Sequence, residues 1–324
     1  MTAMIYKGDT CTMRRIVLGL LTLLALSVAP LTAAQEEPAL LTGEELGLPE
    51  IEITVTDEGW DAPSEIPAGR YLVTASYEGE QDFGTAAFLR LPDDWSIDDL
   101  NAHLAESEAA TSDQPSDGTT VNDVENTVPD LEWLYELTLA GGVSPVSGGT
   151  AQGIIDLFPG EWAIWADSFT PAAVPLTVTG QMPADLADPE ASVTVTESSD
   201  GQSFDFSVTG EFTVGTQVIK VVNASNQPHF IEFVQLSSPA TDDQVVAYFE
   251  TPEGGTPDTE SSLAAGFEVF LSPLYGATQS PGSTQWMVAT LDPGWYAMIC
   301  WLPDPNHNNV SHALSGMIEV FEVG

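Results

Sequence analysis

The residues of this chain that could do chemistry gather near its end. Cys300 follows an alternating apolar run in which Tyr296 and Met298 share one face, and His312 and Met317 come soon after it. Such a run predicts a strand that delivers Cys300 to its end, where a loop can bring a thiolate, an imidazole and a thioether to one point. This soft ligand set is selective for copper.

A trigonal copper site needs a second imidazole, and His229 is the candidate for it. His229 follows a polar turn at 226–228 and opens a β-rich run in which Ile231 and Phe233 share its face. The pattern places this imidazole at the rim of an apolar core.

Three sequence features together resemble the cupredoxins, which are the blue or type 1 copper proteins. They are Pro228-His229 ahead of a strand, the spacing Tyr296-x-x-x-Cys300, and His312 with four residues before Met317. The resemblance implies a Greek-key β-sandwich and one type 1 copper ion held by His229, Cys300, His312 and Met317.

Two positions depart from the pattern of that family. Eleven residues separate Cys300 from His312, more than small cupredoxins use, and this length makes His307 a rival ligand. The position after the first histidine, often Asn in the family, is Phe230 here.

Each candidate also has a plain structural interpretation. His229 could be a core histidine bonded to backbone, and Met317 could fill a gap in the core. His307 lies in a Pro-Asp-Pro-Asn-His-Asn-Asn run, which is typical of an exposed turn. Only the combined spacing of cysteine, histidines and methionine favours metal ligation over these interpretations.

The start of the chain predicts export. Arg14 and Arg15 precede a long apolar run that ends in Thr32-Ala33-Ala34. We interpret residues 1–34 as a secretory signal peptide, too short to span a membrane in the mature protein. The expected location is extracellular, periplasmic or on the cell surface.

Removing that segment leaves Cys300 as the one cysteine, so no internal disulfide could form. Metal ligation is one explanation for a single unpaired cysteine in an exported protein. Intermolecular pairing and burial as a small hydrophobe are the alternatives.

The charge is strongly acidic. Residues 1–34 hold three of the six basic residues and one of the 49 acidic residues, so 3 basic and 48 acidic residues would remain, a net charge of −45. Such a surface repels nucleic acid and anionic lipid and favours solubility and cationic partners. A salty habitat, where screening weakens self-repulsion, is another explanation.

An internal repeat divides the chain. The segment 148–166 aligns with 282–300 at a constant offset of 134, and short acidic-capped helices are expected at 95–106 and from Asp242. We therefore predict an all-β protein of two tandem cupredoxin-like β-sandwiches, each with a short helical insertion. The expected parts are a flexible lead-in at 35–49, a domain at 50–180, a linker at 181–190 and a domain at 191–324.

The alignment also predicts that the first domain lacks the metal site. It sets Ala166 at the place of Cys300, and Phe83, Gly84 or Thr85 at the place of His229. Nothing like the segment from His312 to Met317 follows Ala166. Copper chemistry is therefore expected in the second domain only.

These features favour a secreted electron carrier with one copper ion and an unidentified redox partner protein. A copper oxidase or reductase needs a second copper centre, and only four histidines are present in the whole chain. The alternatives are a binding or scaffold module without metal, and a copper storage or delivery protein. The sequence predicts no membrane span and does not reveal the oligomeric state.

Overall fold

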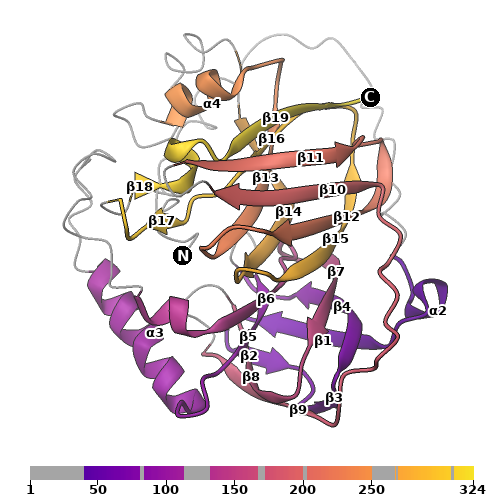
Figure 1. The fold of residues 1–324 in the computed structure, drawn as a ribbon, viewed down its shortest axis with the longest axis vertical. Coiled ribbons are helices and arrows are strands. Elements are labelled where there is room, and N and C mark those ends of the chain that lie inside the picture. Colours follow the sequence, from indigo (N-terminus) through magenta and orange to yellow (C-terminus); the bar gives the residue numbers. More distant parts are fainter. Residues whose placement is uncertain are drawn as a thin grey trace, which may run out of the picture.

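Strands and short turns make up most of the protein, as the alternating apolar pattern predicts (Figure 1). The computed structural model describes residues 40–80, 84–112, 132–166, 172–199, 203–249, 267, 269–307 and 310–324. The predicted signal peptide at 1–34 lies outside these residues. In the described part of the chain, no helix has the length and apolar character needed to cross a membrane.

The first half of the chain contains nine strands among its described residues. The strands are β1 (Glu50–Thr56), β2 (Gly59–Asp61), β3 (Glu65–Pro67), β4 (Gly69–Tyr77), β5 (Ala86–Arg90), β6 (Thr138–Val143), β7 (Thr150–Leu157), β8 (Gly160–Trp165) and β9 (Val174–Thr179). The helices are α2 (Gly43–Leu46), α3 (Ile97–Ser112) and the 3-10 helix η3 (Glu132–Glu136).

The second half follows the same plan. Its strands are β10 (Val193–Ser199), β11 (Phe204–Gly210), β12 (Gly215–Asn223), β13 (His229–Leu236), β14 (Val269–Gln279), β15 (Thr284–Leu291), β16 (Gly294–Ile299), β17 (Pro303–Asp304), β18 (Val310–Ser311) and β19 (Ile318–Val323). The helices are α4 (Asp242–Phe249) and the 3-10 helix η4 (His312–Ser315).

Two large sheets run through both halves. The first has the order β11-β10-β12-β15-β7-β4-β1-β2 and the second β19-β16-β13-β14-β6-β5-β8-β9-β3. Apolar side chains of β1, β4, β5 and β8, among them Val73 and Phe88, pack together between the sheets. The predicted all-β sandwich architecture is confirmed.

The two halves share these sheets, which the sequence does not indicate. β7 pairs with β15 in one sheet, and β6 pairs with β14 in the other, both antiparallel. In Figure 1 the indigo and magenta strands of the first half therefore continue directly into the orange and yellow strands of the second. Pairing across the junction protects four strands that would otherwise be exposed sheet edges.

Strand pairing is the same in each half. From the junction outward, β7-β4-β1-β2 corresponds to β15-β12-β10-β11, and β6-β5-β8-β9 corresponds to β14-β13-β16-β19. Each half has one parallel pair at the same place, β1 with β4 in the first half and β10 with β12 in the second. The bounds of β7 and β8 also precede those of β15 and β16 by 134 residues, the offset seen in the sequence. This correspondence agrees with the interpretation of an internal repeat, while the boundaries at 50–180 and 191–324 stay predictions.

Both expected helices form. The N-terminus of α3 is capped by Ser96, whose hydroxyl accepts from the backbone N–H of Asp99, while the Asp99 carboxylate accepts from Ser96. The helix α4 begins at Asp242 as expected, and its buried face includes Val245. Residues 40–49, assigned to the flexible lead-in, contain the helix α2, and Leu41 exchanges two hydrogen bonds with the side chain of Gln152.

The segment 181–190, predicted as the linker, contains neither helix nor strand and is held by two cations. Arg70 of β4 donates to Asp156, to the carbonyl of Ala187 and to Asp188, and its guanidinium lies 4.2 Å from the ring centroid of Trp286. Lys220 of β12 also binds Asp188. Two of the three basic residues after residue 34 therefore tie the two halves to the segment between them.

Replacing Arg70 by Met is expected to lower the free energy of unfolding by about 3 kcal/mol, because Asp156 loses a partner that is only 6% exposed. Urea unfolding of the purified protein measures this change. Arg90→Met is the matched control, since it removes the same charge from a residue with no ion pair among the described residues. Equal decreases in the free energy of unfolding of the two variants would contradict the proposal that Arg70 ties segment 181–190 to the first half.

Candidate metal centre

Two neighbouring strands position the first two candidate ligands. His229 is the first residue of β13, and Cys300 directly follows β16. Because β13 and β16 are antiparallel neighbours, with Glu232 opposite Ile299, the start of one strand lies beside the end of the other. The third candidate, His312, opens η4 in the loop that leads to β19.

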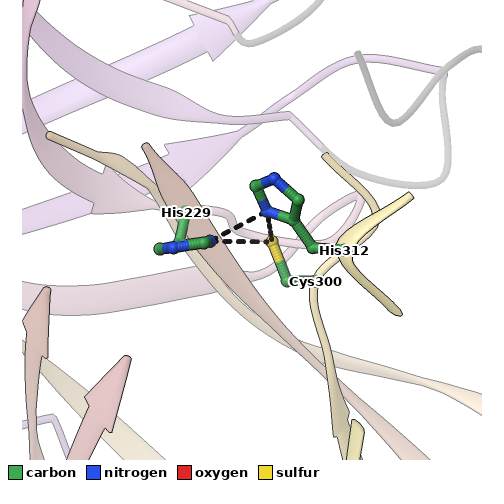
Figure 2. Close-up of side chains that lie close together, drawn as sticks. All are labelled: His229, Cys300 and His312. Carbon is green, nitrogen blue, oxygen red and sulfur yellow. Dashed lines mark hydrogen bonds between the residues drawn. The ribbon is translucent and has the colours of Figure 1, made fainter. Parts of the chain in front are cut away.

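The three side chains converge, as Figure 2 shows. Cys300 Sγ lies 3.7 Å from His229 Nδ1 and 3.7 Å from His312 Nδ1, and the two Nδ1 atoms are 2.9 Å apart. A small divalent metal bonded to sulfur at about 2.3 Å and to nitrogen at about 2.0 Å, at a trigonal angle, sets these atoms about 3.7 Å apart. The sulfur–nitrogen distances therefore fit a metal bound between the three residues, whereas the two nitrogens, 2.9 Å apart, would have to separate to about 3.5 Å for the same geometry.

The long loop between Cys300 and His312 is folded into a small hairpin. β17 pairs with β18, so that the extra residues form a two-stranded arm. His307 lies in the turn of this arm, is 46% exposed, and forms an ion pair with Asp304. The cluster of potential metal ligands found among the described residues includes His312 and not His307.

Main-chain hydrogen bonds close the loop around Cys300. The Cys300 N–H donates to the carbonyl of Met317, and the Met317 N–H donates to that of His312. Gly316 makes this return possible, because its φ of 108° is costly for other residues and an added Cβ would lie 2.8 Å from the Phe204 carbonyl. Met317 is fully buried beside the cluster, and its role as the weak axial ligand stays a prediction.

Cys300 is enclosed completely. Burial raises the pKa of its thiol, while the backbone N–H groups of Phe230 and Leu302, which donate to the sulfur, act in the opposite direction. A thiol in this environment stays protonated at neutral pH unless a cation stabilises the thiolate. The two N–H groups are oriented to receive the charge of such a metal-bound thiolate.

The two imidazoles are neutral in the metal-free protein. Burial lowers the pKa of His229 to about 2, with a further contribution from the neighbouring His312. Burial likewise lowers the pKa of His312 to about 4. Both rings are therefore ready to act as neutral ligands over the physiological pH range.

Hydrogen bonds determine which nitrogen of His229 carries the proton. Its Nε2 lies 2.7 Å from Ser225 Oγ. Asn223 Oδ1 and the Gln227 carbonyl, which only accept, compete for the single hydroxyl proton of Ser225. This competition favours the arrangement in which the Ser225 oxygen accepts from His229 Nε2–H and the lone pair of Nδ1 faces Cys300.

Gln227 is the corresponding hydrogen-bond partner of His312. Its Oε1 lies 3.2 Å from His312 Nε2, its Nε2 donates to Asp304 Oδ1, and the Tyr135 hydroxyl donates to Oε1 over 3.4 Å. This amide joins the loops before His229 and after Cys300. It thereby ties these two loops together.

Sequence reasoning assigned no role to Gln227, Asp304 or Tyr135. The amide and the carboxylate stand next to prolines in turn-like segments, and Tyr135 lies 92 residues from its partner. The sequence gives one indication of these contacts: Gln227 lies two residues before the candidate ligand His229. Phe204 of the other sheet was also missed; its ring stacks on that of His312 at a centroid distance of 3.9 Å.

The first half has no counterpart of this cluster among its described residues. The registers of β5 with β8 and of β13 with β16 set Gly84 at the place of His229, and the offset of 134 sets the buried Ala166 at that of Cys300. His103, on α3, is instead stacked between Trp95 and Trp133. The structure thus sets Gly84 and Ala166 at these two positions, and the absence of a metal site from the first half stays a prediction.

A buried carboxyl group lies behind the cluster. Glu197 of β10 is fully buried, accepts one hydrogen bond from Gln279, and its Oε1 has no partner among the described residues. Burial raises the pKa of Glu197 to about 8. The folded protein therefore keeps this group protonated at a pH where the unfolded chain loses the proton.

The variant Glu197→Gln is expected to gain stability relative to the wild type as pH rises. A carboxyl whose folded pKa is raised contributes its full stability below about pH 4.5 and loses it towards pH 8, by up to about 1.4 kcal/mol per pH unit. Urea unfolding of the metal-free proteins at pH 5 and pH 8 tests this, because every other titrating group cancels between them. A difference that stays constant with pH would contradict it.

Comparison with known proteins gives weak similarities. No protein-family model and no curated protein matches the chain. Among solved structures, a dithionite-reduced auracyanin from the photosynthetic bacterium Roseiflexus castenholzii is 22% identical over 42% of this chain and 99% of its own, with a TM-score of 0.24. A multicopper oxidase is 11% identical over 85% and 88% of the two chains (TM-score 0.23), and a copper nitrite reductase from Nitrosomonas europaea is 11% identical over 85% and 93% (TM-score 0.22). At these TM-scores the similarities carry no argument about function.

Proposed function

We propose that this protein is a type 1 copper protein that binds one copper ion through His229, Cys300 and His312, with Met317 as the weak axial ligand. One observation carries the proposal: two imidazole Nδ1 atoms and a thiol sulfur meet in a sealed site, with their remaining N–H groups directed outward to Ser225 and Gln227. Two nitrogens and one sulfur are the donor set of blue copper centres. The resemblance of the sequence to cupredoxins supports the same assignment.

The surroundings support single-electron transfer rather than catalysis. A copper ion held here would gain or lose one electron. The buried rings and the anchored loop leave the ligands little freedom to rearrange, which favours a site that serves both oxidation states. Among the described residues, the one group of His, Cys, Asp or Glu side chains that could hold a metal ion is His229, Cys300 and His312.

The route to the surface starts at His312. Through Gln227 this ring connects to Tyr135, which is 36% exposed, and through Asp304 to the exposed His307. We propose that electrons exchange with a partner on this side of the protein. The strongly acidic composition favours a partner with a basic surface.

Export completes the proposal. The charged head, apolar run and small residues at 1–34 support cleavage after Ala34 and a secreted mature protein. The mass of the mature chain, isolated from the host, checks this. A chain that retains residues 1–34 would contradict secretion without affecting the metal site.

Titration of the metal-free protein with Cu(II) tests the function. One equivalent of Cu(II) is expected to give an intense absorption at roughly 600 nm from thiolate-to-copper charge transfer. A protein that binds no stoichiometric copper would be a scaffold or binding module. Rapid transfer of the bound copper to a chelator, combined with poor redox cycling, would indicate a copper storage or delivery protein instead.

A further inference from the structure

A hydrogen-bonded chain links the exposed imidazole of His307, through the buried carboxylate of Asp304, to the buried His312. Asp304 is fully buried and accepts from His307 Nδ1, from the Asn306 N–H at 2.8 Å and from Gln227 Nε2 at 3.0 Å. Gln227, 6% exposed, continues the chain to His312 Nε2. All four side chains belong to the loops that carry the candidate ligands.

The chemistry of Asp304 determines the orientation of the Gln227 amide. A carboxylate only accepts hydrogen bonds, so the amide NH2 must face Asp304 and the amide oxygen must face His312. The opposite orientation would set the Gln227 oxygen 3.0 Å from a carboxylate oxygen. The Tyr135 hydroxyl, 3.4 Å from the amide oxygen, adds a second donor to it.

The amide in turn determines the tautomer of His312. Because Gln227 Oε1 only accepts, it favours a proton on His312 Nε2 over the competing Nδ1–H bond to His229, and the lone pair of Nδ1 then faces Cys300 and His229. Without an acceptor at Gln227, the favoured tautomer is the other one. In that tautomer His312 Nδ1–H would donate to His229 Nδ1, 2.9 Å away, and neither Nδ1 atom would have a free lone pair for a metal.

We propose that the Asp304–Gln227 pair is the positioning device that holds His312 in its metal-binding tautomer. Asp304 fixes the amide and the amide fixes the imidazole, so neither residue touches the metal position. The inference rests on the proposed function, but the tautomer itself is a property of the metal-free protein. Removal of outer hydrogen-bond partners of metal ligands typically lowers metal affinity about 10- to 100-fold.

The decisive variant is Gln227→Met, which keeps the length of the side chain and removes the acceptor. Long-range 15N–1H NMR of the metal-free protein reads the tautomer of each of the four histidines. In Gln227→Met, His312 is expected to change from Nε2–H to Nδ1–H while His229, held by Ser225, keeps its tautomer. The affinities for Cu(II) and for redox-silent Zn(II), measured by competition with a chromophoric chelator, should fall about 10- to 100-fold.

Two further variants separate this role from general damage to the fold. The double variant Gln227→Glu/Asp304→Asn keeps an acceptor oxygen toward His312, and its new amide at position 304 can donate to the second oxygen at position 227, so it is expected to retain the Nε2–H tautomer of His312. Gln152→Met removes another buried amide, one that bonds Leu41 and Thr74 in the first half, and should change neither tautomer nor affinity. A His312 that stays wholly Nε2–H in Gln227→Met, with affinities within about twofold of the wild type, would overturn the proposal.

Asp304 has its own test, which also covers a Gln227→Met variant that fails to fold. Asp304→Ala frees the amide to rotate and should mix the two tautomers of His312, whereas Asp304→Asn, which can offer its amide oxygen to Gln227, should not. Unchanged tautomers in Asp304→Ala would refute the role of Asp304. If the wild type binds neither copper nor zinc, the proposed function fails, and the tautomer result still decides this inference.

Discussion

Replacing Cys300 by Ser is expected to abolish the absorption at roughly 600 nm that Cu(II) gives with the wild type, because the band requires a copper–thiolate bond. Serine is close to cysteine in size, and its hydroxyl oxygen can accept from the Phe230 and Leu302 N–H groups that face the sulfur, so the fold should survive the change. The visible spectrum of the copper-loaded variant, at matched copper and protein concentrations, measures the effect. The intensity should fall more than about tenfold.

Met298→Leu is the control for this change. Met298 is another fully buried sulfur-containing residue, two positions earlier on β16, and it is not one of the four proposed ligands. Its replacement should leave the colour unchanged. A band that persists in Cys300→Ser would show that the sulfur of this residue does not hold the metal, and the electron-transfer proposal would then fail.

The backbone plan could be predicted from particular sequence patterns. Pro159-Gly160 and Pro293-Gly294, at the offset of 134, mark the turns between β7 and β8 and between β15 and β16. Ser96 with acidic residues after it predicted the start of α3. These signals are local, because a turn or a helix cap depends on a few consecutive residues.

The convergence of His229, Cys300 and His312 was also predictable, because a strand end and the following loop leave few places for these side chains. The plain structural interpretation of His229, a core histidine bonded to backbone, does not describe its contacts with Ser225 and Cys300. The exposure of His307 in a turn matches the expectation from its Pro- and Asn-rich surroundings.

Contacts between distant segments could not be predicted in the same way. The pairing of β7 with β15 needs two edge strands from different halves to meet, and no residue type marks that meeting. Gln227 and Tyr135 are polar residues that would suit any surface loop, and only the folded chain brings them to His312. The first half, which lacks the corresponding ligands, thus contributes a side chain to the surroundings of the site in the second.

Replacing His312 by Ala is expected to eliminate the blue copper spectrum, whereas His307→Ala should preserve it. The reason is geometric: His312 Nδ1 lies 3.7 Å from Cys300 Sγ, while His307 is in the turn of the arm and engages Asp304 through its own Nδ1. Loss of a direct ligand should reduce Cu(II) affinity by more than the roughly 100-fold that loss of an outer partner can cost.

The two variants are a matched pair, because each removes one imidazole from the same loop, and visible absorption with chelator competition compares them directly. His307→Ala leaves Asp304 with its bonds to Gln227 and Asn306, so the amide behind His312 keeps its orientation. The reverse outcome, colour lost in His307→Ala and kept in His312→Ala, would mean that the arm folds back over the cluster and that the other loop histidine binds the metal. That result would require His307 to leave the Asp304 carboxylate, to which its Nδ1 is bonded.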